Sequence, residues 1–186
     1  MTEDDICSMI QSWENISLLV QFISDHPEHF KSILKKAMDD SLSENWRAAW
    51  IIDKIHEKNP EIVKPYLNQI TQFVIATNNH GKKRHFLKLI SQHPIDEENE
   101  VLLLNYCLDV FINSSETIAV KVHAMQVLFE IALQEPGFAS ELTELIENEL
   151  EYHYSAGLAS RARKLLPKLY KIKKQDIQQN ILPQYP

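Results

Sequence analysis

Residues 120–131 read VKVHAMQVLFEI, and four of them, Ala124, Val127, Leu128 and Ile131, decide the fold. Their spacing of 3, 1 and 3 residues places them on one side of an α-helix. The same register occurs four more times, as Ile16/Leu19/Val20/Ile23, Ala48/Ile51/Ile52/Ile55, Lys83/Phe86/Leu87/Ile90 and Ala162/Leu165/Leu166/Leu169. Five copies of one helical stripe predict a repeating all-α protein.

A proline follows each of the first four stripes after four or five residues, as Pro27, Pro60, Pro94 and Pro136. Because proline ends one helix and is accepted at the first position of the next, the pattern predicts helices in pairs. Repeats of roughly 30–45 residues made of two helices are typical of α-solenoids. We therefore expect a right-handed α-α superhelix of about four to five helix pairs.

We expect a single domain over residues 1–186, in which the tail at 175–186 caps the last helix. A short helix is expected at 3–11, followed by pairs at 14–25 and 27–39, 44–58 and 60–76, 80–92 and 97–112, and 117–133 and 137–153, with a last helix at 156–173.

Composition agrees with an all-α protein, since 44% of the residues are hydrophobic and only three are glycine. The start, Met1-Thr2-Glu3-Asp4-Asp5, lacks a basic region followed by an apolar core, and no stretch is long enough to cross a bilayer. We therefore expect a cytoplasmic protein. Cys7 and Cys107 lie in apolar helical surroundings without metal or redox spacing, which favours small core residues over a disulfide or a nucleophile.

The stretch at 120–131 resembles the first helix of a HEAT repeat, which has a β-branched residue, a basic residue, a small alanine, then leucine and isoleucine. Residues 47–52, reading RAAWII, are similar in their second half. Two departures stand out: Lys83 takes the alanine position of the third copy, and Asn45 takes the position that is basic at Lys121. The resemblance covers nearly the whole chain. It implies a curved armadillo-like scaffold that binds proteins and, less often, nucleic acid.

Trp46, Trp50 and Asp53 fall at i, i+4 and i+7, so two indoles and a carboxylate share one edge of a helix. The trio is faintly similar to the aromatic residues and carboxylate of HEAT-like DNA alkylation repair glycosylases, but their catalytic pattern does not map onto this chain. The alternative is that both indoles pack against neighbouring helices, with Asp53 at the rim.

The chain shows no other catalytic constellation and no metal-ligand pattern, because His26 and His29 lack a third ligand. We expect no enzyme activity, no cofactor and no metal.

The residue before the small residue of each stripe is basic in four copies: Arg47, Lys82, His123 and Arg161. Because equivalent positions stack along a solenoid, these four side chains are expected to form a basic row that binds an acidic peptide or a phosphate backbone. The alternative is that each cation pairs with a carboxylate of the next helix.

Charge is polarised along the chain, whose net charge is −7. The last 26 residues hold seven of the 19 Lys and Arg residues and one of the 26 acidic residues, whereas the helix before them is acidic at Glu141, Glu144, Glu147, Glu149 and Glu151. The two helices are expected to pair across their interface. Two interpretations of the basic helix stay open: a patch for nucleic acid or an acidic partner, and, favoured over it, a solvated cap at the end of the solenoid. The sequence thus favours a non-enzymatic protein-interaction scaffold whose partner is another protein or an acidic peptide. Nucleic-acid binding, including a repair-like HEAT protein, is the alternative, and no membrane is implied.

Overall fold

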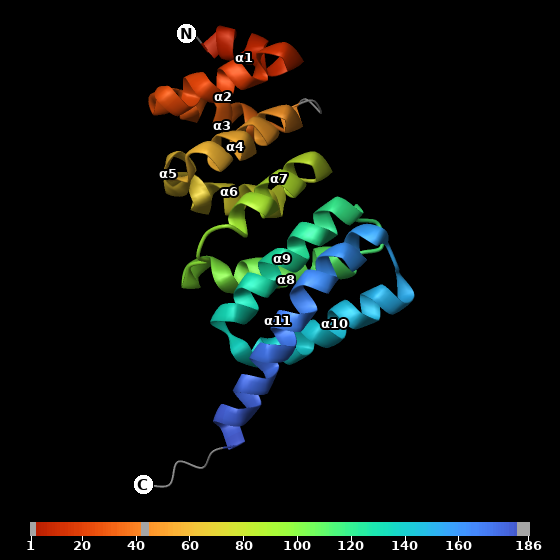
Figure 1. The fold of residues 1–186 in the computed structure, drawn as a ribbon. Coiled ribbons are helices and arrows are strands. Elements are labelled where there is room, and N and C mark those ends of the chain that lie inside the picture. The colour runs from red at the N-terminus through yellow and green to blue at the C-terminus, as the bar shows by residue number, and fades with distance from the viewer. Residues whose placement is uncertain (1–2, 42–44, 182–186) are drawn as a thin grey trace, which may run out of the picture. The chain divides into compact units, whose positions relative to one another are not determined.

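The computed structural model describes residues 3–41 and 45–181, and every regular element in those residues is a helix (Figure 1). The α-helices are α1 (Glu3–Gln11), α2 (Ile16–Asp25), α3 (Phe30–Ala37), α4 (Trp46–Lys58), α5 (Pro60–Val63), α6 (Leu67–Ala76), α7 (His80–Ile90), α8 (Glu97–Ile112), α9 (Ile118–Gln134), α10 (Ala139–Tyr152) and α11 (Ala156–Ile181). The all-α class predicted from the repeated stripes is confirmed.

Three of the four prolines open a helical turn as predicted. Pro27, Pro60 and Pro136 are each the first residue of such a turn, where the missing N–H group would have no helical partner. Pro94 lies instead in the link that precedes α8. That helix is capped by Asp96, whose carboxylate accepts from the backbone N–H of Asn99 at 2.9 Å.

The predicted helix at 60–76 is interrupted by Pro65. A 3-10 turn at Lys64–Tyr66 separates α5 from α6. Proline has no N–H to donate and its ring clashes with the carbonyl four residues earlier, so an α-helix cannot pass through this position undisturbed.

The predicted stripes form the core. All four apolar residues of the second stripe, Ala48, Ile51, Ile52 and Ile55, are fully buried, as are Ala124, Val127 and Leu128 of the fourth. Lys83 is also buried, although it replaces the alanine of the third stripe. Exceptions are Val20 and Leu166, which are half-buried.

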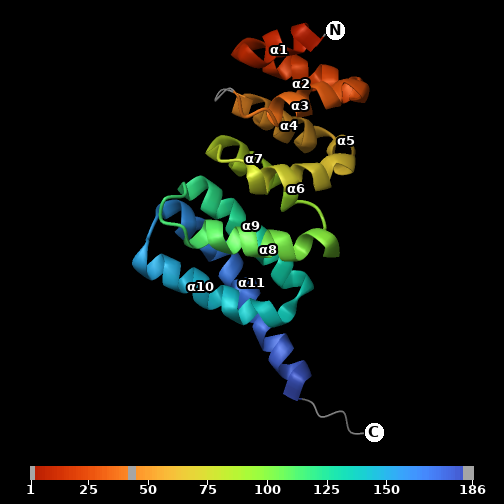
Figure 2. The same ribbon diagram turned by 180° about the vertical axis from the view of Figure 1, so that it is seen from behind.

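The chain divides into two compact units, the first ending at His93 and the second beginning at Pro94. In unit 1, helix α4 packs against α2, α3 and α7, and α6 packs against α7 (Figures 1 and 2). The boundary falls between α7 and α8, which the sequence predicted as one pair. The single domain over 1–186 stays a prediction.

In unit 2, helix α9 packs against α8, α10 and α11. Helix α11 runs to Ile181, so residues 175–181 continue the last helix. The side chains of Ile177 and Ile181 and residues 182–186 lie outside the described part of the chain, and the capping role of the tail stays a prediction.

Leu128→Ala tests the helical register, because Leu128 is fully buried in α9. We expect a loss of about 2–5 kcal/mol in the free energy of unfolding, since the smaller side chain leaves a cavity. Urea denaturation followed by circular dichroism measures it. Leu133→Ala on the same helix is the control, because Leu133 is 50% exposed. Equal losses in the two variants would show that the register is wrong.

Candidate functional site

The seven candidate residues are divided between the two units. Trp46, Arg47, Trp50 and Asp53 all lie on α4, and Lys82 lies on α7, within unit 1. His123 on α9 and Arg161 on α11 belong to unit 2.

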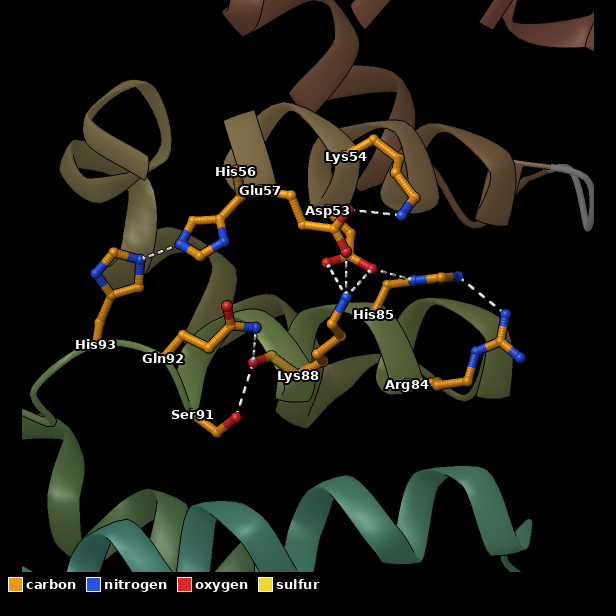
Figure 3. Close-up of polar contacts among 10 residues, drawn as sticks. All are labelled: Asp53, Lys54, His56, Glu57, Arg84, His85, Lys88, Ser91, Gln92 and His93. Carbon is orange, nitrogen blue, oxygen red and sulfur yellow. Dashed lines mark hydrogen bonds and ion pairs between the residues drawn. The ribbon is translucent and has the colours of Figure 1, made fainter. Parts of the chain in front are cut away.

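Asp53 lies at the centre of a polar network between α4 and α7 (Figure 3). Its carboxylate, 4% exposed, receives two bonds from the Lys88 ammonium at 2.9 and 3.0 Å and one from His85 Nδ1 at 3.1 Å. Lys88 also contacts Glu57 at 2.8 Å, and Glu57 accepts from Lys54 at 2.6 Å. Burial opposes ionisation of Asp53, but the hydrogen bonds from His85 and Lys88 outweigh it and hold the pKa of this carboxyl below its usual range.

The protonation of His85 follows from its two partners. The guanidinium of Arg84 only donates hydrogen bonds, so Nε2 of His85, 3.0 Å away, must accept. The proton therefore sits on Nδ1, which donates to Asp53. The indole of Trp46 stacks on the same imidazole, with ring centroids 6.4 Å apart and planes inclined by 6°. The imidazole is thus held in one tautomer and one orientation.

This network corrects the expectation of a rim carboxylate beside two indoles. Asp53 is buried and bonded to two neighbours, so its carboxylate is not open to a nucleic-acid ligand. The indoles also face different helices: Trp46 stacks on His85 of α7, whereas Trp50 lines a hollow of about 350 Å³ with residues of α2. The arrangement fits helix packing better than a glycosylase site.

Lys82 is not part of an accessible basic row. Its side chain is fully buried, and its ammonium donates to the Asp40 carboxylate at 2.6 Å and to the Asp39 carbonyl at 2.7 Å. Thr77 donates to the other oxygen of Asp40 at 2.7 Å. Burial opposes ionisation of Asp40, but the bonds from Lys82 and Thr77 lower its pKa. Lys82 therefore ties the segment after α3 to the first turn of α7, and Thr77 ties it to the connection before that helix.

Arg47 donates a hydrogen bond from its guanidinium to the backbone carbonyl of Gln11 at 2.9 Å, on α1. Both row members in unit 1 are thus engaged within the protein. For Lys82, the partner is the carboxylate of Asp40 in the segment after α3, whereas the alternative interpretation of the row predicted a carboxylate of the next helix.

A histidine pair that the sequence did not single out lies at the C-terminal end of unit 1. Nε2 of His56 on α4 lies 2.7 Å from Nε2 of His93, the last residue of the unit (Figure 3). Only one of these nitrogens can carry the shared proton. Burial lowers the pKa of both imidazoles; the neighbouring His93 further lowers that of His56, and Lys64 further lowers that of His93.

The sequence did carry a signal for the contacts between α4 and α7. The signal is the spacing of the partners, which lie about one repeat apart. Asp53 and Lys88 occupy the same position of the second and third stripes, five residues after Ala48 and Lys83. Trp46 and Gly81 are likewise equivalent, and a Cβ added to Gly81 would lie 2.8 Å from Cβ of Trp46. The missing side chain of Gly81 thus allows α7 to approach α4.

In unit 2, His123 and Arg161 line one groove of about 540 Å³ between α9 and α11. Ile118, Val122 and Gly157 contribute its apolar part, and Ser160 and Lys164 add polar groups. The Arg161 guanidinium donates to the neutral side-chain oxygen of Gln126 at 2.6 Å, so its charge is not neutralised by that bond.

The expected pairing between acidic α10 and basic α11 is not found in the described residues. Glu147 accepts from the hydroxyl of Tyr170, and buried Glu149 pairs with Lys121 on α9 at 2.5 Å and with His153 at 3.1 Å. No ion pair joins a carboxylate of α10 to Lys or Arg of α11 among these residues. The cations of α11 are exposed at Arg163, Lys164, Lys168, Lys171 and Lys174.

Comparison with known families gives one finding. The family model described as "HEAT repeat domain" matches residues 7–169. The chain belongs to the HEAT repeat family. HEAT repeats are commonly protein-interaction scaffolds, and the family is generally non-enzymatic. Comparison with the curated proteins and with the solved structures gives no match.

Two further features of this HEAT protein concern membrane-spanning helices and metal-binding groups in the described residues. None of their helices has the length and apolar character needed to cross a bilayer. Nor do their His, Cys, Asp and Glu side chains form a group of three placed to hold a metal ion.

Asp53→Asn tests the network, because the amide cannot neutralise Lys88. We expect a loss of about 1–3 kcal/mol in the free energy of unfolding, because Lys88 and His85 lose the charged carboxylate to which they donate. The loss stays moderate because Lys88 keeps its second carboxylate, Glu57. Glu57→Gln is the control at a side chain that is 42% exposed, and there we expect less than about 1 kcal/mol. Urea denaturation measures both. Equal small losses would contradict a network centred on Asp53.

The histidine pair predicts a loss of stability in mild acid. A histidine whose pKa is lowered in the folded state binds fewer protons there than in the unfolded chain, so its stabilising contribution is complete above the ordinary pKa of 6.5 and is lost as the pH falls below it. The melting temperature should therefore fall between pH 7.5 and 5.5.

The same change of pH should lower the melting temperature of His93→Gln less. His80→Gln, at an exposed histidine of α7, is the control and should behave like the unmodified chain. Charged neighbours that also act on the pair are Asp53, Glu57, Glu61, Lys64 and Lys88. An equal fall in His93→Gln and the unmodified chain would exclude the pair as the source.

Proposed function

We propose that this HEAT protein is a non-enzymatic interaction module that binds another protein through the cations of α11. The observation that carries the proposal is the contrast between the two kinds of charge in the molecule. Lys82, Lys88 and Lys121 are bonded to carboxylates within the fold, whereas the exposed cations of α11 have no such partner among the described residues.

Four of the α11 cations share one stripe of the helix. Arg161, Lys164, Lys168 and Lys171 follow at spacings of 3, 4 and 3 residues, which we call the basic stripe. A row of like charges held on one helix repels itself, and a partner of opposite charge relieves that repulsion. An acidic protein segment is the complementary partner.

An enzymatic role has less support from the geometry. Asp53, the acidic candidate, has both oxygens bonded to cationic or donor groups, and His85 has both ring nitrogens engaged. Burial raises the pKa of the Cys107 thiol and so keeps this free cysteine protonated and unreactive.

Nucleic-acid binding is the alternative that the same cations allow. The net charge of −7 argues against a broad electrostatic footprint on a phosphate backbone. We therefore favour a protein partner, and a cytoplasmic location stays a prediction from the sequence.

Charge reversal on the basic stripe tests the proposal. The tagged chain and the variant Lys168→Glu/Lys171→Glu are used to capture proteins from the cells that express it, followed by mass spectrometry. We expect the variant to lose the acidic proteins that the unmodified chain retains. Lys31→Glu/Lys35→Glu, at exposed lysines of α3, makes the same charge change and should retain them.

Circular dichroism checks that both variants fold. Retention of the same proteins by the α11 variant would exclude the basic stripe as the binding surface. Capture that disappears when the lysate is treated with nuclease would favour nucleic acid instead.

A further inference from the structure

We infer that the groove between α9 and α11 binds an acidic segment of the partner protein that inserts a large aliphatic side chain. This inference rests on the proposed function and adds where the partner is held and what chemistry it presents. The groove lies at the N-terminal end of the basic stripe, because Arg161 and Lys164 belong to both.

The floor of the groove is apolar and open. Ile118 on α9 is 40% exposed, and Val122 lies one turn further along the same helix. Opposite them stands Gly157, where an added Cβ would lie only 2.9 Å from a methyl carbon of Ile118. The absent side chain therefore lets α11 approach α9 and leaves the exposed face of Ile118 uncovered. Exposed apolar surface enclosed by polar residues is typical of a recognition site.

The rim of the groove is cationic. Lys164 is exposed, and Arg161 bonds a neutral amide, so neither charge is neutralised by a carboxylate among the described residues. The groove lining itself contains no Asp or Glu. An apolar floor with a cationic rim fits a ligand with an aliphatic side chain flanked by carboxylates, which is why the occupant is an acidic segment of a protein.

The stripe extends the site beyond the groove. Lys168 and Lys171 continue the line of Arg161 and Lys164 along α11, and the Lys168 ammonium lies 5.5 Å from the ring centre of Phe129 on α9. Successive cations are separated by about 4.5–6 Å along the helix axis. A partner anchored in the groove can therefore place further carboxylates along the stripe.

The test uses the full chain and three fluorescent probes measured by fluorescence anisotropy. The first is a short peptide of glutamates with two central leucines; the second replaces the leucines with serines; the third is a single-stranded oligothymidine of the same charge. We expect the leucine peptide to bind about tenfold or more tightly than the serine peptide, since only it fills the apolar floor.

Two variants act on the groove, and each has a matched control. Lys164→Glu reverses a rim charge, and Ser160→Trp fills the groove; both should weaken the leucine peptide about tenfold or more. Lys31→Glu makes the same charge change at an exposed lysine of α3, and Ser114→Trp adds the same ring at an exposed residue outside the groove. Neither control should change binding.

The outcomes separate this inference from the proposed function. The groove is not the binding site if Ser160→Trp leaves binding of the leucine peptide unchanged, if the leucine and serine peptides bind equally, or if neither peptide binds.

The basic stripe is tested independently. Loss of binding in Lys168→Glu/Lys171→Glu would still support the stripe when the groove fails, whereas retained partner capture by this variant overturns the proposed function. Tighter binding of the oligothymidine than of either peptide assigns the site to nucleic acid.

Discussion

Each helix pair of this protein carries more apolar surface than it can bury alone, and the fold depends on that constraint. The stripes of α2, α4, α7, α9 and α11 are covered only when neighbouring helices pack on them. Ala48 and Ala124 add only a small side chain to these contacts, and both are fully buried. Even Lys83, at the alanine position of the third stripe, is drawn into the interior. Burial of a stripe position thus depends more on its spacing within the stripe than on which residue type occupies it.

Once the stripes are packed, equivalent positions of α4 and α7 lie side by side, and polar residues are matched across helix contacts within each unit. Asp53 faces Lys88, and Trp46 has room because its equivalent is Gly81. Lys82 reaches back to Asp40, and Lys121 to Glu149. A buried charge without a partner would be costly, so each of these cations lies beside a carboxylate. Such contacts favour one alignment of α4 against α7 over alignments in which one helix is shifted along the other.

The basic stripe of α11 departs from this rule, and the departure bears on function. Lys82, Lys88 and Lys121 have carboxylates, but the exposed cations of α11 have none among the described residues, although acidic α10 packs against the same helix. Glu147 and Glu149 are instead taken by Tyr170, Lys121 and His153. Charge on α11 that no carboxylate of the fold neutralises is available to a partner.

The sequence by itself determined the helices, their repeat and the residues of the core, because a 3.6-residue period and helix-ending prolines are local properties. It also placed Trp46, Trp50 and Asp53 on one helix and Arg47, Lys82, His123 and Arg161 at equivalent positions. Only the tertiary structure decided which of these side chains are buried and what they bond: Lys82 turned inward to Asp40, Asp53 to Lys88, while Arg161 came to line a groove. Those outcomes depend on partners 35 to 42 residues away and on exact helix separation, such as the approach at Gly81, which no local pattern encodes.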